Sequence, residues 1–74
     1  MINILVTAVG SELASSVIKA IKLMQTPYRL VGCDICQEVI GKYWCDSFHL
    51  VPQCRDEEAY IKVIKKVIKE EKVD

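Results

Sequence analysis

The sequence predicts an α/β domain built on a small parallel sheet. Two apolar runs, residues 2–7 and 28–34, do not alternate with polar residues, a pattern typical of strands covered on both faces. The segment between them repeats apolar residues at helical spacing. A helix that joins two buried strands indicates a right-handed crossover, so we expect the two strands to be parallel.

The first strand and the helix after it meet at a turn that contains one glycine, Gly10. Ser11 is expected to cap this helix, and Glu12 suits the positive end of its dipole. The helix should end before Pro27, because the residue preceding proline avoids helical angles. The expected apolar face consists of Leu13, Ala14, Val17, Ile18, Ile21 and Met24.

The second half of the chain predicts one more strand and one more helix. Residues 38–44 could hold a short helix, which Gly41 weakens, and residues 47–51 form a third strand that Pro52 stops. A last helix opens with the acidic residues 56–58. Its expected apolar face is Tyr60, Ile61, Ile64, Val67 and Ile68. Its lysines are interpreted as a solvated face rather than a nucleic-acid patch: Lys62, Lys65, Lys66, Lys69 and Lys72.

This order of elements predicts a Rossmann-like, three-layer half-domain. Right-handed crossovers place the strands in the order 3-2-1, with helices on both faces of the sheet. The last helix covers the second face only if it leads to a fourth strand beside the first, and that strand would begin near Val73-Asp74. We therefore expect residues 1–74 to be one domain, truncated before the fourth strand. The unpaired edge of the first strand leaves a homo-oligomer as an open alternative.

Composition and charge exclude several partners. The chain has 74 residues, of which 51% are hydrophobic and 27% are charged, which is typical of a globular domain. Ten basic and ten acidic residues cancel, so nothing favours nucleic acid or a membrane surface as a partner. No apolar run approaches the length of a membrane span, and the start lacks the basic region of a signal peptide. A cytoplasmic location is expected.

Four cysteines could indicate a metal or redox site. Cys33 and Cys36 form a C-x-x-C pair, whereas Cys45 and Cys54 stand alone with His49 between them. Zinc sites usually use two close pairs, and a redox C-x-x-C places its first cysteine at the start of a helix rather than in a strand. The favoured interpretation is four reduced, partly buried residues and no metal site, with zinc and redox roles as the alternatives.

Candidate binding residues lie at the carboxyl ends of the strands, where open α/β sheets bind ligands. They are Thr7, Gly10, Ser11 and Asp34, with Gln53 as a weaker candidate. Gly10 would let an anion approach the backbone N–H groups at the helix start. The competing interpretations are a tight turn at Gly10 and a loop-capping role for Asp34. No catalytic constellation can be assigned, because the single histidine has no partner that the sequence identifies.

The motifs in order resemble the N-terminal (pre-ATP-grasp) domain of ATP-grasp enzymes, and in particular proteins like the large subunit of carbamoyl-phosphate synthase. The matching positions are Val6-Thr7, Gly10, Val31-Gly32, Asp34, Asp46, Val51-Pro52 and Val73-Asp74. The resemblance covers essentially the whole chain. It departs from the family at the turn Ala8-Val9-Gly10-Ser11, which has fewer glycines than is usual there.

The resemblance implies an ATP-dependent ligase as the parent protein, in which a carboxylate is activated as an acyl phosphate and captured by a nucleophile. ATP and Mg²⁺ are then cofactors of the parent and bind in a downstream ATP-grasp domain. The domain of residues 1–74 would lend strand-end loops to the small-molecule substrate side of the cleft. It is expected to hold no catalytic residue and no cofactor of its own.

Two other functions stay open. A dinucleotide-binding half-domain would use Gly10 at the turn and Asp34 for the ribose hydroxyls. However, the three fingerprint glycines read Ala8, Gly10 and Leu13, and Leu13 would obstruct the close helix–strand contact. The second alternative is a small non-enzymatic interaction module that pairs through its open sheet edge.

Overall fold

A computed structural model describes residues 1–74 and confirms the small α/β domain with a three-stranded parallel sheet. The elements in chain order are β1 (Ile2–Val6), α1 (Glu12–Lys22), β2 (Tyr28–Asp34), the 3-10 helix η1 (Ile40–Trp44), β3 (Ser47–Leu50) and α2 (Glu57–Glu70). Neither α-helix has the length and apolar character that crossing a membrane requires.

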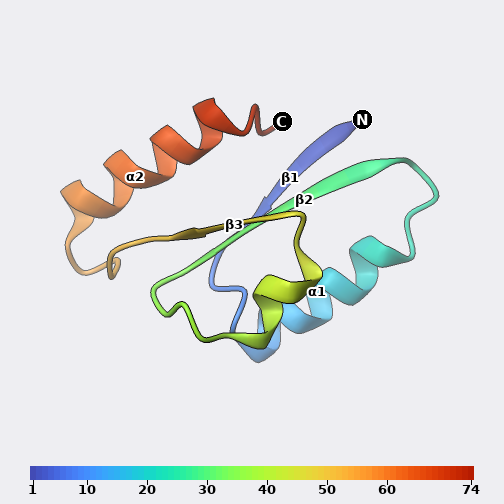
Figure 1. Cartoon of the computed structure of the whole chain (residues 1–74), viewed down its shortest axis with the longest axis horizontal. Helices are drawn as coiled ribbons and strands as arrows, with labels where there is room; N and C mark the ends of the chain where they lie inside the picture. Colours follow the sequence, from blue (N-terminus) through green and yellow to red (C-terminus); the bar gives the residue numbers. More distant parts are fainter.

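The sheet runs in the order β1-β2-β3, with both pairs of neighbours parallel. Val6 pairs with Gly32, and Asp34 pairs with Leu50, so the three strands end at the same edge. Figure 1 shows α1 and η1 on one side of the sheet and α2 on the other. The loops that follow the three strands therefore leave the sheet at the same end.

The core lies mainly between the sheet and α1. A buried cluster is formed by Val6, Val9, Ala14, Ile18 and Leu30. The apolar face expected for this helix is only partly correct, because Leu13 is 80% exposed and Val17 is 45% exposed. Both residues line a groove beside the outer edge of β1, which we call the edge groove, and no strand covers them there.

The second face of the sheet is covered less completely. Val67 is the one fully buried residue of α2, whereas Ile61 and Ile68 are 50% and 40% exposed. All five lysines expected on the solvent side are exposed: Lys62, Lys65, Lys66, Lys69 and Lys72. The prediction of a solvated lysine face is confirmed, but the apolar stripe beside it is only partly buried.

The element boundaries depart from expectation at several places, and β3 ends at Leu50 rather than at residue 51. β1 ends at Val6 rather than residue 7, because Ala8 turns the chain with a φ of 52°. α1 ends at Lys22, before residue 27 is reached. The short helix around Gly41 is a 3-10 helix, and its N-cap residue Val39 makes no side-chain capping bond.

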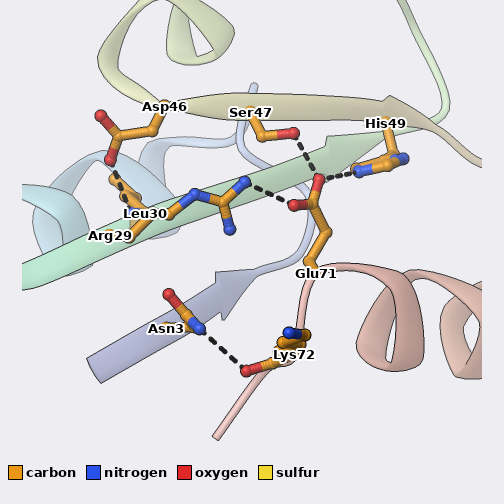
Figure 2. A network of polar contacts seen from close by, with 8 residues as sticks. All are labelled: Asn3, Arg29, Leu30, Asp46, Ser47, His49, Glu71 and Lys72. Atoms are coloured by element: carbon orange, nitrogen blue, oxygen red, sulfur yellow. Dashed lines mark hydrogen bonds and ion pairs between the residues drawn. The ribbon is translucent and has the colours of Figure 1, made fainter. Parts of the chain in front are cut away.

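Residues 72–74 lie along the outer edge of β1 at Asn3. The Asp74 N–H donates to the Asn3 carbonyl at 2.9 Å, and the Asn3 N–H donates to the Asp74 carboxylate at 2.8 Å. The Asn3 side chain also donates to the Lys72 carbonyl, as Figure 2 shows. At this edge the Asn3 N–H therefore donates a hydrogen bond and the Asn3 carbonyl accepts one.

Two non-glycine residues have left-handed backbones, Ala8 with φ 52° and Lys72 with φ 54°. This conformation costs an L-residue about 1–2 kcal/mol, and glycine removes that cost. Glycine also gives the unfolded chain more conformational freedom, which offsets part of the gain. Ala8→Gly and Lys72→Gly should therefore each stabilise the fold by about 0.5–1 kcal/mol. Urea unfolding measures this gain. The control is Ala20→Gly in α1, an exposed helical site that should lose about 1 kcal/mol. Equal losses at all three sites would contradict the assignment.

Candidate functional site

A pocket of about 360 Å³ lies at the carboxyl ends of the strands, and we call it the strand-end pocket. Ala8 follows β1, Asp34 and Ile35 lie at the end of β2, and Val51 follows β3. Tyr60 in the first turn of α2 also lines the pocket. The remaining lining residues are Gln53, Cys54 and Arg55 from the loop between β3 and α2. This is the place where parallel sheets usually bind ligands.

Asp34 joins the loops around the strand-end pocket. Its Oδ2 accepts the Gly10 N–H at 2.8 Å, and its Oδ1 accepts the Cys36 N–H at 3.0 Å. Its carbonyl accepts the Val51 N–H at 3.0 Å. One residue thus holds the turn after β1, the loop after β2 and the end of β3, which makes Asp34 a loop anchor as well as a lining residue.

Residue 10 is a glycine because a side chain there would not fit, and not because its backbone conformation requires glycine. No glycine in the chain has a positive φ. A Cβ at residue 10 would lie 2.6 Å from Val39 Cγ1 and 3.0 Å from Asp34 Oδ2. The expected approach of an anion to this backbone N–H does occur, but the anion is the chain's own carboxylate. An external phosphate would have to compete with Asp34 for that N–H group.

The other two predicted site residues lie elsewhere. Ser11 caps α1, because its Oγ accepts the Ala14 N–H at 3.1 Å, and its own N–H donates to the Ala8 carbonyl at 2.9 Å. Thr7 and Ser11 line the edge groove, not the strand-end pocket. The structure therefore brings Gly10 and Asp34 together and separates Thr7 and Ser11 from the pocket. Gln53, the weaker candidate, does line it.

The cysteines form no disulfide. All four are free thiols; Cys33 is buried, Cys45 is half-buried, and Cys36 and Cys54 are exposed. Burial raises the pKa of the Cys33 thiol and that of the Cys45 thiol, which disfavours the reactive thiolate at both. No group of three potential metal ligands is found in the structure.

His49 has a partner that the sequence did not identify. Figure 2 shows Glu71, the C-cap residue of α2, accepting hydrogen bonds from Arg29, Ser47 and His49. The hydrogen bonds from Ser47, His49 and Arg29 lower the pKa of Glu71 from 4.5 to about 2. Ser47 and His49 lie two residues apart on β3, so their side chains are on the same face of the sheet. Two polar side chains on a covered face need a hydrogen-bond partner, and this is the signal from which a partner could have been predicted.

The Glu71 cluster is structural rather than catalytic. Its carboxylate accepts from both the Ser47 hydroxyl and the His49 ring nitrogen, so this hydroxyl donates to the carboxylate and not to the imidazole that would activate it as a nucleophile. Arg29 and Ser47 lie at the beginnings of their strands, whereas the strand-end pocket lies at the strand ends. The cluster therefore fastens the end of α2 to the sheet.

Removal of the Asp34 carboxylate tests its anchoring role. Asp34→Ala should cost about 1–3 kcal/mol of stability and speed amide exchange at Gly10 and Cys36, because both N–H groups lose their acceptor. Hydrogen exchange followed by NMR measures both amides. Glu38→Ala is the control, since this carboxylate is exposed and accepts no hydrogen bond within the chain. Unchanged exchange at both amides would exclude the anchor.

Comparisons with protein-family models, with curated proteins and with solved structures found no match to this chain.

Proposed function

We propose that residues 1–74 form the N-terminal, substrate-side domain of a cytoplasmic ATP-grasp ligase similar to carbamoyl-phosphate synthase. The strand-end pocket is the observation that carries this proposal, because the loops after all three strands contribute to it. In the parent, ATP and Mg²⁺ would bind in a downstream ATP-grasp domain. The pocket would then form the wall of the cleft that faces the small-molecule substrate.

The residues that suggested the family have structural tasks in keeping with the proposal. Asp34 anchors the pocket loops, and the Asp46 carboxylate accepts the Leu30 N–H at 2.7 Å where β3 begins. Val51 is buried at the start of the pocket loop. These tasks account for aspartates at these positions without assigning them catalysis.

A Rossmann-like half-domain that lacks its fourth strand is the second part of the proposal. The outer edge of β1 bonds to Asp74 through Asn3, whereas Leu5, the next residue facing that edge, has no strand partner there. The edge groove beside it has a volume of about 430 Å³ and is mostly apolar. An apolar strand parallel to β1 would cover the exposed side chains of Leu13 and Val17.

The dinucleotide alternative has less support. The Gly10 N–H that would receive a phosphate bonds to Asp34, and the Ser11 N–H bonds to the Ala8 carbonyl. The objection based on Leu13 was wrong, however, since this side chain is 80% exposed and does not lie between α1 and the sheet. Ala14 takes the buried position instead.

Calorimetric titration with NAD⁺, NADP⁺ and Mg·ATP tests the proposal against this alternative. We expect each to bind the 74-residue chain with a Kd weaker than about 1 mM, because the N–H groups of the turn are occupied and the ATP site lies in another domain. Micromolar binding of NAD⁺ or NADP⁺ would contradict the ligase-domain proposal and favour the dinucleotide function.

The interaction-module alternative is favoured only by the open edge of β1. It predicts a stable dimer in which two copies of β1 pair, whereas the ligase-domain proposal expects the edge to be covered by the parent's own strand. Light scattering after size exclusion distinguishes them, and a monodisperse dimer that Leu5→Pro abolishes would support the interaction module.

A further inference from the structure

The strand-end pocket contains one cationic and one anionic side chain that do not pair with each other. Asp34 and Arg55 both line it. The ion pairs of the chain join Glu71 to Arg29 and His49, and Lys66 to Glu70, so neither pocket charge is neutralised by a side chain. The acidic residues 56–58 at the start of α2 do not line the pocket.

The Arg55 side chain is oriented by one hydrogen bond, and its two terminal amino groups remain available to a ligand. Its Nε donates to Gln53 Oε1 at 2.7 Å, which holds the guanidinium plane beside the pocket. Its two terminal amino groups have no acceptor in the chain. Paired donors of this kind match the two oxygens of a carboxylate, and charge-assisted bonds are the stronger class of hydrogen bond.

Asp34 keeps capacity to accept from a ligand. Each carboxylate oxygen has two acceptor positions, and each uses one of them for a backbone N–H, that of Gly10 or that of Cys36. The carboxylate is half-buried and fixed by these bonds. An ammonium group, with three donors, is suited to the positions that are left.

The rest of the lining is mainly apolar. Ala8, Ile35 and Val51 contribute aliphatic surface, and Tyr60 contributes its ring. The volume of about 360 Å³ is at the lower end of the range for small-molecule sites, which begins at about 300 Å³. The pocket therefore favours a small ligand that has both charges and an apolar part.

We propose that the strand-end pocket binds a free α-amino acid with an apolar side chain. Arg55 pairs with the ligand carboxylate, Asp34 accepts from the ammonium group, and the apolar lining covers the side chain. The role of the bound amino acid as a substrate rests on the proposed function, since a ligase joins a carboxylate to a nucleophile such as an amine. The binding itself needs only the pocket.

Titration of the ¹⁵N-labelled chain with L-leucine, followed by NMR, tests the inference. We expect saturable shifts at Ile35, Gln53 and Tyr60. Leucinamide, which lacks the carboxylate, and N-acetyl-leucine, which lacks the ammonium group, should each bind about tenfold more weakly. The absence of saturable shifts up to about 50 mM leucine would overturn the inference, and so would an analogue that binds as tightly as leucine.

The variant Arg55→Gln distinguishes recognition from folding. It should weaken leucine binding by about tenfold and leave leucinamide binding unchanged, because the amide has no carboxylate for Arg55 to hold. Lys62→Gln on the exposed side of α2 is the matched control and should change neither. Equal loss for both ligands, or no loss for leucine, would overturn the assignment of Arg55.

The two proposals fail separately. Micromolar NAD⁺ or NADP⁺ binding would overturn the ligase-domain function whatever leucine does. Absence of leucine binding, with no dinucleotide binding, would overturn the amino-acid site alone.

Discussion

Replacing Gly41 with alanine is expected to unfold most of the protein. A Cβ at residue 41 would lie 2.0 Å from the Val9 carbonyl oxygen and 2.7 Å from its carbonyl carbon. These are backbone atoms of a residue that is only 1% exposed, so neither partner can move aside without disturbing the turn after β1. A backbone clash this close should cost at least the upper end of the about 1–3 kcal/mol typical of overpacking, which is comparable to the about 3–5 kcal/mol that a core of this size supplies.

Urea unfolding monitored by circular dichroism measures the effect, with loss of the folded baseline at zero urea as the expected result. Ile40→Ala is the matched control, because this side chain is 72% exposed in the same 3-10 helix and its loss should change stability by less than about 0.5 kcal/mol. A Gly41→Ala protein as stable as the control would show that η1 does not pack against Val9 as described.

Glu71→Gln should be the second most damaging change. The side chain of Glu71 is only 12% exposed and accepts from Arg29, Ser47 and His49. Hydrogen bonds to a charged group contribute about 1.5–3 kcal/mol, and the amide keeps one acceptor oxygen but brings a donor into a site already filled by donors. We expect a loss of about 2 kcal/mol in urea unfolding at neutral pH.

The same residue should make stability depend on acidity. Its pKa is lowered from 4.5 to about 2 in the folded chain, so the unfolded state binds a proton first as the pH falls. The stabilisation is thus fully present above the unfolded pKa and is lost progressively as the pH falls from about 4.5 through about 2. In Glu71→Gln this contribution should be missing over that range.

Glu70→Gln is the matched control for both measurements. Its carboxylate is exposed and lies 3.9 Å from the Lys66 amine, a surface pair that contributes little. We expect its unfolding curve at neutral pH to stay within about 0.5 kcal/mol of the original, and its acid dependence to be retained. If the two variants behaved alike, the Glu71 cluster would not fasten α2 to the sheet.

Local patterns predicted most of the elements of this fold. The unbroken apolar run of β2, the cap at Ser11 and the acidic start of α2 act over a few residues, and the structure has each of them. The degree of burial was harder to predict. Leu13 and Ile61 have the periodicity of a core face but stay exposed, because burial depends on which other elements lie beside them.

The candidate site was predicted only in part, for the same reason. Their position at the strand ends predicted Gly10 and Asp34 as site residues, and the two are in contact. No local pattern predicted that the Asp34 carboxylate would accept the Gly10 N–H. Arg55 and Tyr60 reach the pocket only through the path of the loop after β3. The Glu71 cluster joins residues 22 to 42 positions apart, a separation at which no periodicity gives a signal.

The intact mass of the natural protein tests the central proposal most directly. An antibody raised against residues 1–74 would recover the polypeptide from its source, and mass spectrometry would weigh it. The ligase proposal predicts a chain several times heavier than the 8.4 kDa of these residues, since an ATP-grasp domain must follow in the same polypeptide. A natural chain of 8.4 kDa would contradict the proposal.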